Sequence, residues 1–170
     1  MKKMLCVIIS FALSYTLISC DSSKESIQEP VDFYYCQLEM DYGIESQAIS
    51  KEVRDAKDRR QDYSHLLSLY FKGPESYSLY NPFPRNLSLL SFSLQDGTAA
   101  VHLSASFATL TGLDLSLACA CLTMTVCEMT GAQQVTVSAA DSLLDGNPQI
   151  TLSPEDVLLL DDSSVIIDPE

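Results

Sequence analysis

The sequence predicts an α+β domain, a sandwich in which a mixed or antiparallel sheet is covered by two helices. Three observations lead to this prediction. Segments of strand character precede a segment with helical periodicity, an Asp-Gly turn joins two further strands, and a long apolar helix separates that hairpin from the last strand. Strands and helices in this order build a sheet that carries its helices on one face.

Two strands are predicted at the start of the domain. Val31–Leu38 is rich in aromatic residues and alternates in polarity, as a strand with one buried face does. Ala48–Arg54 alternates more weakly, with Ile49 and Val53 among polar neighbours. The second segment is therefore the weaker strand.

A helix is predicted from Asp58 to Lys72, where the spacing of the apolar residues changes. Gly73-Pro74 ends this helix. His65 lies off its apolar stripe, so we expect that side chain to face solvent. The stripe has the i, i+3, i+4, i+7 spacing of one helix face and consists of Tyr63, Leu66, Leu67 and Tyr70.

A hairpin is the clearest local structure in the sequence. Its strands are Leu87–Leu94 and Ala99–Leu103, and the Asp96-Gly97 pair between them suits the positive backbone angles of a tight turn. In the second strand Val101, Leu103 and Ala105 share one face. His102 lies on the other, so we expect it to be exposed or at a sheet surface.

The apolar segment Leu113–Met129 is predicted to be a buried central helix, because it is apolar on all sides. Acidic residues near its ends and its marginal length argue against a membrane span. Gln134–Ala139 follows as the last core strand. Residues 147–170 form a C-terminal extension, in which Ser153-Pro154-Glu155-Asp156 is typical of a helix start.

The N-terminus has the pattern of an export signal. A basic start, Lys2-Lys3, precedes an apolar run that is too short to cross a bilayer comfortably. That run ends in Leu17-Ile18-Ser19-Cys20, which resembles the lipobox of bacterial lipoprotein precursors. The resemblance implies a signal peptide over residues 1–19 and a diacylglyceryl group on Cys20, which would anchor the chain at the outer face of the cell membrane. Residues 20–30 are polar and would form a flexible tether.

The charge of the chain excludes several partners. The formal net charge is −13, and −15 once Lys2 and Lys3 are removed with the signal peptide. Nucleic acid and anionic membrane surfaces are therefore not expected as partners, apart from the membrane contact made by the lipid. A mature chain of this length predicts a single domain.

The cysteines of the mature chain are expected to be small buried hydrophobes. Cys119 and Cys127 lie two helical turns apart, about 12 Å along the axis, which is too far for a disulfide. The helical spacing of the cysteines does not suit a metal site. A bridge from Cys36 to one of the helix cysteines (Cys119, Cys121 or Cys127) stays open.

No pattern of an enzyme is present in the sequence. It contains no nucleophile elbow, no phosphate-binding glycine loop, no dinucleotide fingerprint and no zinc-protease motif. We therefore predict no catalytic residue, no cofactor and no metal site. Cys20 is the one modified residue that we expect.

Several short motifs resemble the GerMN domain of sporulation and spore germination proteins. They are Tyr70-Phe71-Lys72-Gly73-Pro74 at the helix end, Pro84-Arg85-Asn86-Leu87 before the hairpin, and Val101-His102-Leu103-Ser104 followed by Phe107. The resemblance covers Val31 to Gly146 in register. His102, where members often carry an acidic residue or asparagine, and the cysteine-rich helix depart from the pattern. The resemblance implies an α+β sandwich similar to ring-building domains, with no established catalytic residue.

Two functional hypotheses follow. The leading one is a non-enzymatic envelope lipoprotein that acts in sporulation or spore germination by assembling with envelope proteins or with itself. The alternative is an accessory lipoprotein that binds peptidoglycan in general envelope maintenance. An envelope enzyme is the least favoured reading, because no constellation of residues supports it.

Overall fold

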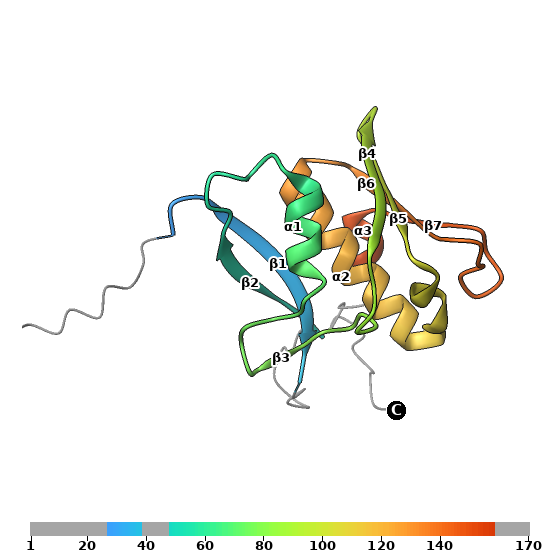
Figure 1. The fold of residues 1–170 in the computed structure, drawn as a ribbon. Helices are drawn as coiled ribbons and strands as arrows, with labels where there is room; N and C mark the ends of the chain where they lie inside the picture. The colour runs from blue at the N-terminus through green and yellow to red at the C-terminus, as the bar shows by residue number, and fades with distance from the viewer. Residues whose placement is uncertain (1–26, 39–47, 159–170) are drawn as a thin grey trace, which may run out of the picture.

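Two β-sheets flank two helices in the computed structural model, which describes residues 27–38 and 48–158 (Figure 1). One sheet has three strands and the other has four. The α+β class is confirmed, but the strands divide into two sheets and do not form one. The expected signal peptide, Cys20 and most of the tether lie outside the described residues.

The first sheet is built on strand β1 (Pro30–Gln37), which pairs antiparallel with β2 (Ile49–Asp55) and β3 (Leu79–Tyr80). Val31, Phe33 and Tyr35 alternate along β1 and are buried. On β2 the residues opposite Phe33 and Val31 are Glu52 and Arg54. The buried face of β2 is therefore polar, and Val53 is 44% exposed.

Helix side chains complete the hydrogen bonding of β1 where no strand lies beside it. The amide of Tyr34 donates to Thr125 Oγ1 at 2.9 Å, and the carbonyl of Tyr34 accepts from the Tyr70 hydroxyl at 2.7 Å. Unpaired backbone groups in a protein interior are costly, so these two side chains stand in for a neighbouring strand. They also join both helices to the first sheet.

The second sheet contains the predicted hairpin. Strands β4 (Leu89–Gln95) and β5 (Thr98–Leu103) turn at Asp96 and Gly97, whose φ angles are +48° and +75°. Strand β5 runs parallel to β6 (Gln134–Ala139), which pairs antiparallel with β7 (Ile150–Leu152). Beyond β5 the chain forms the short 3-10 helix η1 (Ala105–Thr109), so Ala105 is exposed and does not extend the buried face of the strand.

Helix α1 (Tyr63–Tyr70) is shorter at its start than the sequence predicts. Lys57 and Asp58 have positive φ angles of 49° and 64°, which a helix does not allow. The N-terminal cap is Asp62, whose carboxylate accepts from the amide of His65 at 3.1 Å. The predicted apolar stripe still faces the core, because Leu66, Leu67 and Tyr70 are buried.

Helix α2 (Gly112–Thr130) is the predicted central helix. It contacts β1 on one side and β5, β6 and β7 on the other, which explains why it is apolar on all sides. By length and composition alone it could cross a membrane, with a mean hydropathy of 1.4, but 61% of that window is buried inside the domain. The buried position agrees with a core helix.

The domain continues past the expected boundary at Gly146. Strand β7 joins the second sheet, and α3 (Pro154–Leu158) packs against α2 with Val157 buried. The helix start expected at Ser153 is confirmed, because the amide and hydroxyl of Ser153 both donate to Asp156 Oδ2, at 2.7 and 2.8 Å. Residues 150–158 are therefore part of the folded unit.

Candidate functional site

The two histidines lie on different elements and do not form a shared site. His65 is exposed on α1, and its Nδ1 lies 3.2 Å from Arg59 Nη1. His102 is half-buried on β5, with its Nδ1 3.0 Å from the Ser138 hydroxyl. Both positions agree with the prediction of a solvent-facing residue and a sheet-surface residue.

The four cysteines of the domain are buried, as expected, and none of them forms a disulfide with another. Cys36 Sγ on β1 lies 3.7 Å from Cys121 Sγ on α2, so Cys121 is the helix cysteine that meets Cys36 across the core. Burial raises the pKa of Cys119 to about 12 and also raises the pKa of Cys127. These thiols are protonated at neutral pH and behave as small apolar groups.

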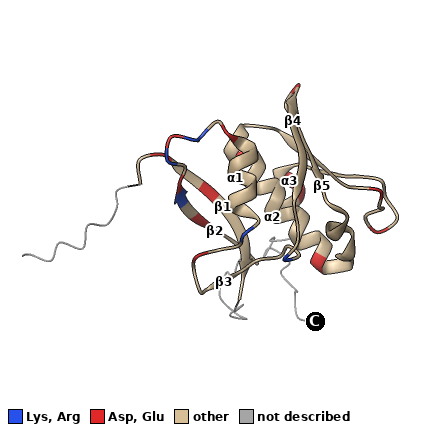
Figure 2. Ribbon diagram, viewed as in Figure 1, with Lys and Arg blue, Asp and Glu red and all other residues tan. Residues whose placement is uncertain are grey.

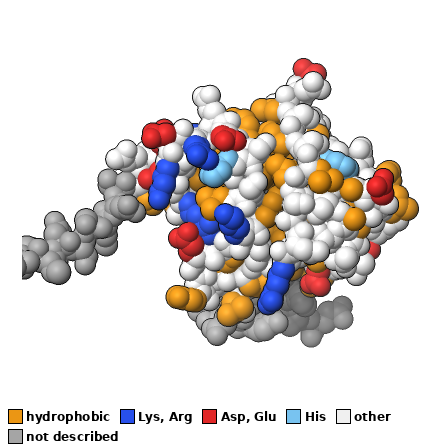
Figure 3. Space-filling model, in the orientation of Figure 1, with side chains coloured by type: hydrophobic (Ala, Val, Ile, Leu, Met, Phe, Trp, Pro, Cys, Tyr) orange, Lys and Arg blue, Asp and Glu red, His pale blue; other side chains and the backbone are white. Residues whose placement is uncertain are grey.

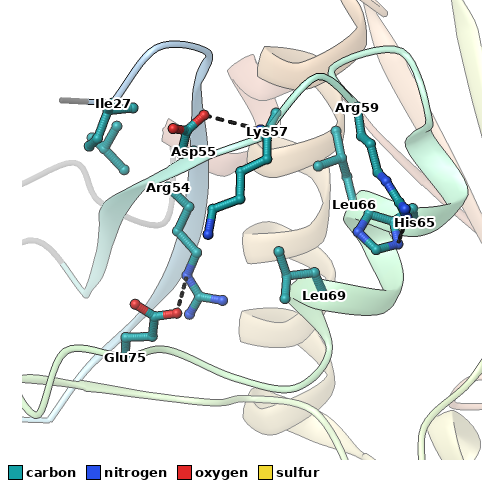
Figure 4. A pocket seen from close by; sticks show the side chains of 11 residues that line it. Ile27, Arg54, Asp55, Lys57, Arg59, His65, Leu66, Leu69 and Glu75 are labelled. Atoms are coloured by element: carbon teal, nitrogen blue, oxygen red, sulfur yellow. Dashed lines mark hydrogen bonds and ion pairs between the residues drawn. The ribbon is translucent and has the colours of Figure 1, made fainter. Parts of the chain in front are cut away.

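A hollow of about 700 Å³ lies between the end of β2 and helix α1 (Figure 4). Its apolar lining includes Ile27, Val53, Leu66 and Leu69. The other residues that line it are Ala56 and the polar or charged residues Arg54, Asp55, Lys57, Arg59, His65 and Glu75. The hollow therefore combines an apolar surface with positive and negative groups.

Arg54 forms the fixed part of this hollow. Its Nη2 lies 2.6 Å from Glu52 Oε1 and donates to the carbonyl of Gly73 at 2.7 Å. The guanidinium lies over the rings of Phe33 and Tyr35, at 5.5 and 6.0 Å from their centroids. Arg54 is thereby held rigidly, with only 8% of its surface exposed.

Glu52 connects Arg54 to the chain after α1. The carboxylate accepts from the amides of Glu75 and Ser76, at 3.0 and 2.7 Å, as well as from Arg54. Burial alone would raise the pKa of Glu52, but these hydrogen bonds and the Arg54 charge outweigh it and lower the pKa. Glu52 is therefore ionised in the folded domain at neutral pH.

Two exposed cations, Lys57 and Arg59, line the hollow. Five of the ten Lys and Arg residues of the chain lie between residues 51 and 60, in a protein whose net charge is −13. Figure 3 shows blue side chains gathered beside α1, and Figure 4 shows Lys57 pointing into the hollow. Lys57 and Asp58 hold the left-handed conformation that non-glycine residues seldom adopt, and such strained residues often occur at binding sites.

The hollow suits a ligand with a negative group and an apolar part. Among residues 27–38 and 48–158, no three His, Cys, Asp or Glu residues are grouped to hold a metal ion. The sequence did not single out Arg54, Lys57 or Arg59. The sequence feature that could have indicated the Glu52–Arg54 ion pair is their spacing, since residues two apart lie on the same face of a strand.

The two sheets and their helices define a small α+β domain. A family model described as sporulation and spore germination matches residues 33–161, and the chain belongs to this family. The resemblance noted in the sequence is thereby confirmed.

Solved structures are similar to the chain at low sequence identity. The tandem GerMN domains of the sporulation protein GerM from Bacillus subtilis match with a TM-score of 0.54 and 16% identity, over 74% of this chain and 45% of that one. This chain thus spans less than half of the tandem protein. A "Putative Lipoprotein" from Clostridium perfringens matches with a TM-score of 0.43 and 19% identity, over 75% of this chain and 90% of that one. Among curated protein sequences none matches.

Proposed function

We propose that this chain is a non-enzymatic envelope lipoprotein that acts in sporulation or spore germination by assembling with other proteins. The observation that carries the proposal is the family match, which begins at residue 33, directly after the lipobox cysteine and its polar tether. The family is associated with sporulation and germination, and no enzymatic activity is known for it.

The anchor is tested by the chemistry of Cys20. Whole cells are labelled with a palmitate analogue, and the labelled chain is recovered from the membrane fraction. The wild-type chain and a Cys6→Ser variant are expected to carry the label, because Cys6 lies in the signal peptide. A Cys20→Ser variant is expected to carry none. Equal labelling of the Cys20→Ser variant would contradict lipidation at this residue.

The role is tested in a spore-forming source organism from which the gene is deleted. Spore yield and the rate of germination are measured beside the parent strain. A defect in either quantity supports the proposal. Normal sporulation together with normal germination would remove it.

Binding of cell-wall peptides is the second candidate, and the hollow favours it. Peptidoglycan stem peptides carry carboxylates and small apolar side chains, which match Lys57, Arg59 and the apolar lining. In this case purified peptidoglycan should retain the full chain, and a Lys57→Glu/Arg59→Glu variant should be retained far less. Lys72→Glu/Arg85→Glu, at two exposed positions outside the lining, changes the charge by the same amount and is the matched control. Retention of all three proteins to the same extent, or of none, would remove this candidate.

A further inference from the structure

Strand β4 is an unusual edge among the sheets of the described residues. The opposite edges β7 and β3 contain only three and two residues, and edge β2 carries alternating charges over Lys51, Glu52, Arg54 and Asp55. Short or charged edges resist pairing with another chain. Strand β4 has seven residues and no charged side chain, so it lacks both protections.

The sequence of β4 is also complementary to itself. The strand has the sequence Leu-Leu-Ser-Phe-Ser-Leu-Gln, and its central five residues, Leu90 to Leu94, are the same in both directions. A symmetric dimer needs a surface that matches its own copy after a two-fold rotation. Two antiparallel copies of β4 meet this condition with Phe92 on the axis.

We propose that β4 pairs with β4 of a second copy of this chain, which joins the two four-stranded sheets into one continuous sheet. The pairing places Ser91 opposite Ser93 of the second copy and Leu90 opposite Leu94. Leu90 and Leu94 are 51% and 40% exposed in the single chain, and each would gain an apolar neighbour. The free N–H and C=O groups of the strand edge would gain partners.

The distribution of charge favours β4 as the place where two copies of the chain can meet. Copies of a protein with a net charge of −13 repel one another over most of their surface. Figure 2 shows β4 without charged residues along its length, with an acid only at the hairpin tip. That acid, Asp96, would lie opposite Ser88 of the second copy and away from its counterpart.

The outward face beside β4 carries no Asp, Glu, Lys or Arg side chain either. Ser91, Ser93 and Gln95 share this face with the residues that they pair with on β5, His102, Ala100 and Thr98. Strand β6 continues the face with Gln134, Thr136 and Ser138. On this face, therefore, no carboxylate, ammonium or guanidinium group meets its counterpart.

A β-bulge limits the pairing at both ends, because the two-fold axis repeats the bulge of each copy at the opposite end. Strand β4 has one extra residue relative to β5 between Leu89 and Ser91, and the ladder is regular from Ser91 to Gln95. With Phe92 on the axis, the bulge falls opposite Leu94 and Gln95 of the second copy. The two Ser91–Ser93 pairs and Phe92 thus lie within the regular part of both strands, and the two Leu90–Leu94 pairs lie at the bulges.

The test uses two differently tagged copies of the full chain, produced together and extracted with mild detergent. One tag is captured and the amount of the other copy is measured. Ser91→Lys/Ser93→Lys puts lysine opposite lysine, and Ser91→Glu/Ser93→Glu puts glutamate opposite glutamate. Ala100→Lys is the control, since it adds a charge to the same face on the central strand β5.

We expect wild-type and Ala100→Lys copies to capture themselves. Each doubly charged variant should capture itself at least about tenfold less, because like charges then face each other across the edge. Capture should return when the lysine and glutamate variants are produced together. That recovery also proves that both variants are folded.

Three results would overturn the pairing. They are wild-type copies that do not capture each other, an Ala100→Lys variant that loses capture as the edge variants do, and capture of a different envelope protein through β4 without a second copy. The inference rests on the assembly part of the proposed function but can fail alone. A deletion defect that the lysine variant repairs would leave the proposed function standing without the pairing.

Discussion

Replacing Arg54 with alanine is expected to lower the free energy of unfolding by about 3 kcal/mol, because it leaves a buried carboxylate without its counter-charge. The guanidinium contacts Glu52 at 2.6 Å, donates to the carbonyl of Gly73 at 2.7 Å, and covers the ring of Phe33. The side chains of Arg54 and Glu52 are 8% and 12% exposed, so water replaces these contacts only in part.

The assay is urea and thermal unfolding of the mature chain from Asp21 to Glu170, which lacks the lipid. A loss of about 3 kcal/mol corresponds to a fall in the melting temperature of roughly 10 °C for a chain of this size. Arg54→Lys keeps the charge but cannot reach Glu52 and the Gly73 carbonyl together, so an intermediate loss is expected. Arg85→Ala, at an exposed position, should change stability by less than about 0.5 kcal/mol.

The same ion pair predicts how stability depends on pH. The pKa of Glu52 is lowered in the folded domain, so its ionised form stabilises the fold at pH values above the pKa of the unfolded chain. This contribution is lost as the pH falls below about 4.5 toward the folded pKa. Arg54→Ala should therefore differ most from the wild type near neutral pH and least in acid. If the free energies of unfolding of Arg54→Ala and the wild type differ by less than about 0.5 kcal/mol at pH 7, the reasoning is refuted.

Three further predictions concern the thiols, a helix end and a buried hydroxyl. In the native protein, iodoacetamide should modify Cys127 first, because it is the most exposed of the four cysteines at 8%. After denaturation all four thiols should react, and a smaller number would indicate a disulfide. Gly131→Ala should cost about 1 kcal/mol in urea unfolding, because φ is +73° and open space surrounds the residue, so only backbone strain opposes the new methyl group. Tyr70→Phe should cost about 1–2 kcal/mol by removing the hydroxyl that donates to the Tyr34 carbonyl, whereas Tyr77→Phe, at 98% exposure, should cost nothing measurable in the same assay.

The elements of the fold that local chemistry determines agree closely with the sequence prediction. Asp96-Gly97 alone places the hairpin, and the largely apolar segment Leu113–Met129 places α2 within one residue at each end. The sequence prediction starts α1 too early, because Asp58 and Asp62 are both suitable N-terminal caps. The left-handed backbone at Lys57 does not show in the spacing of the apolar residues. Strands of two or three residues, such as β3 and β7, carry too little pattern to predict.

Features that depend on distant contacts could not be predicted. The division into two sheets follows from α2 lying between β1 and β6, which no local pattern encodes. The hollow depends on Arg54 reaching the Gly73 carbonyl across nineteen residues of chain. Likewise, the meeting of Cys36 with Cys121 was one of several possibilities until β1 and α2 were placed together.

The central claim is that an anchored GerMN domain acts in sporulation or germination, and complementation of the deletion strain tests it most directly. The strain receives genes for the wild-type chain, Cys6→Ser or Cys20→Ser, and spore yield and the fraction of spores that germinate are measured. We expect the wild type and Cys6→Ser to restore germination or spore yield to the parent level, and Cys20→Ser not to restore it. Full restoration by Cys20→Ser, or a deletion strain that matches its parent from the outset, would contradict the account.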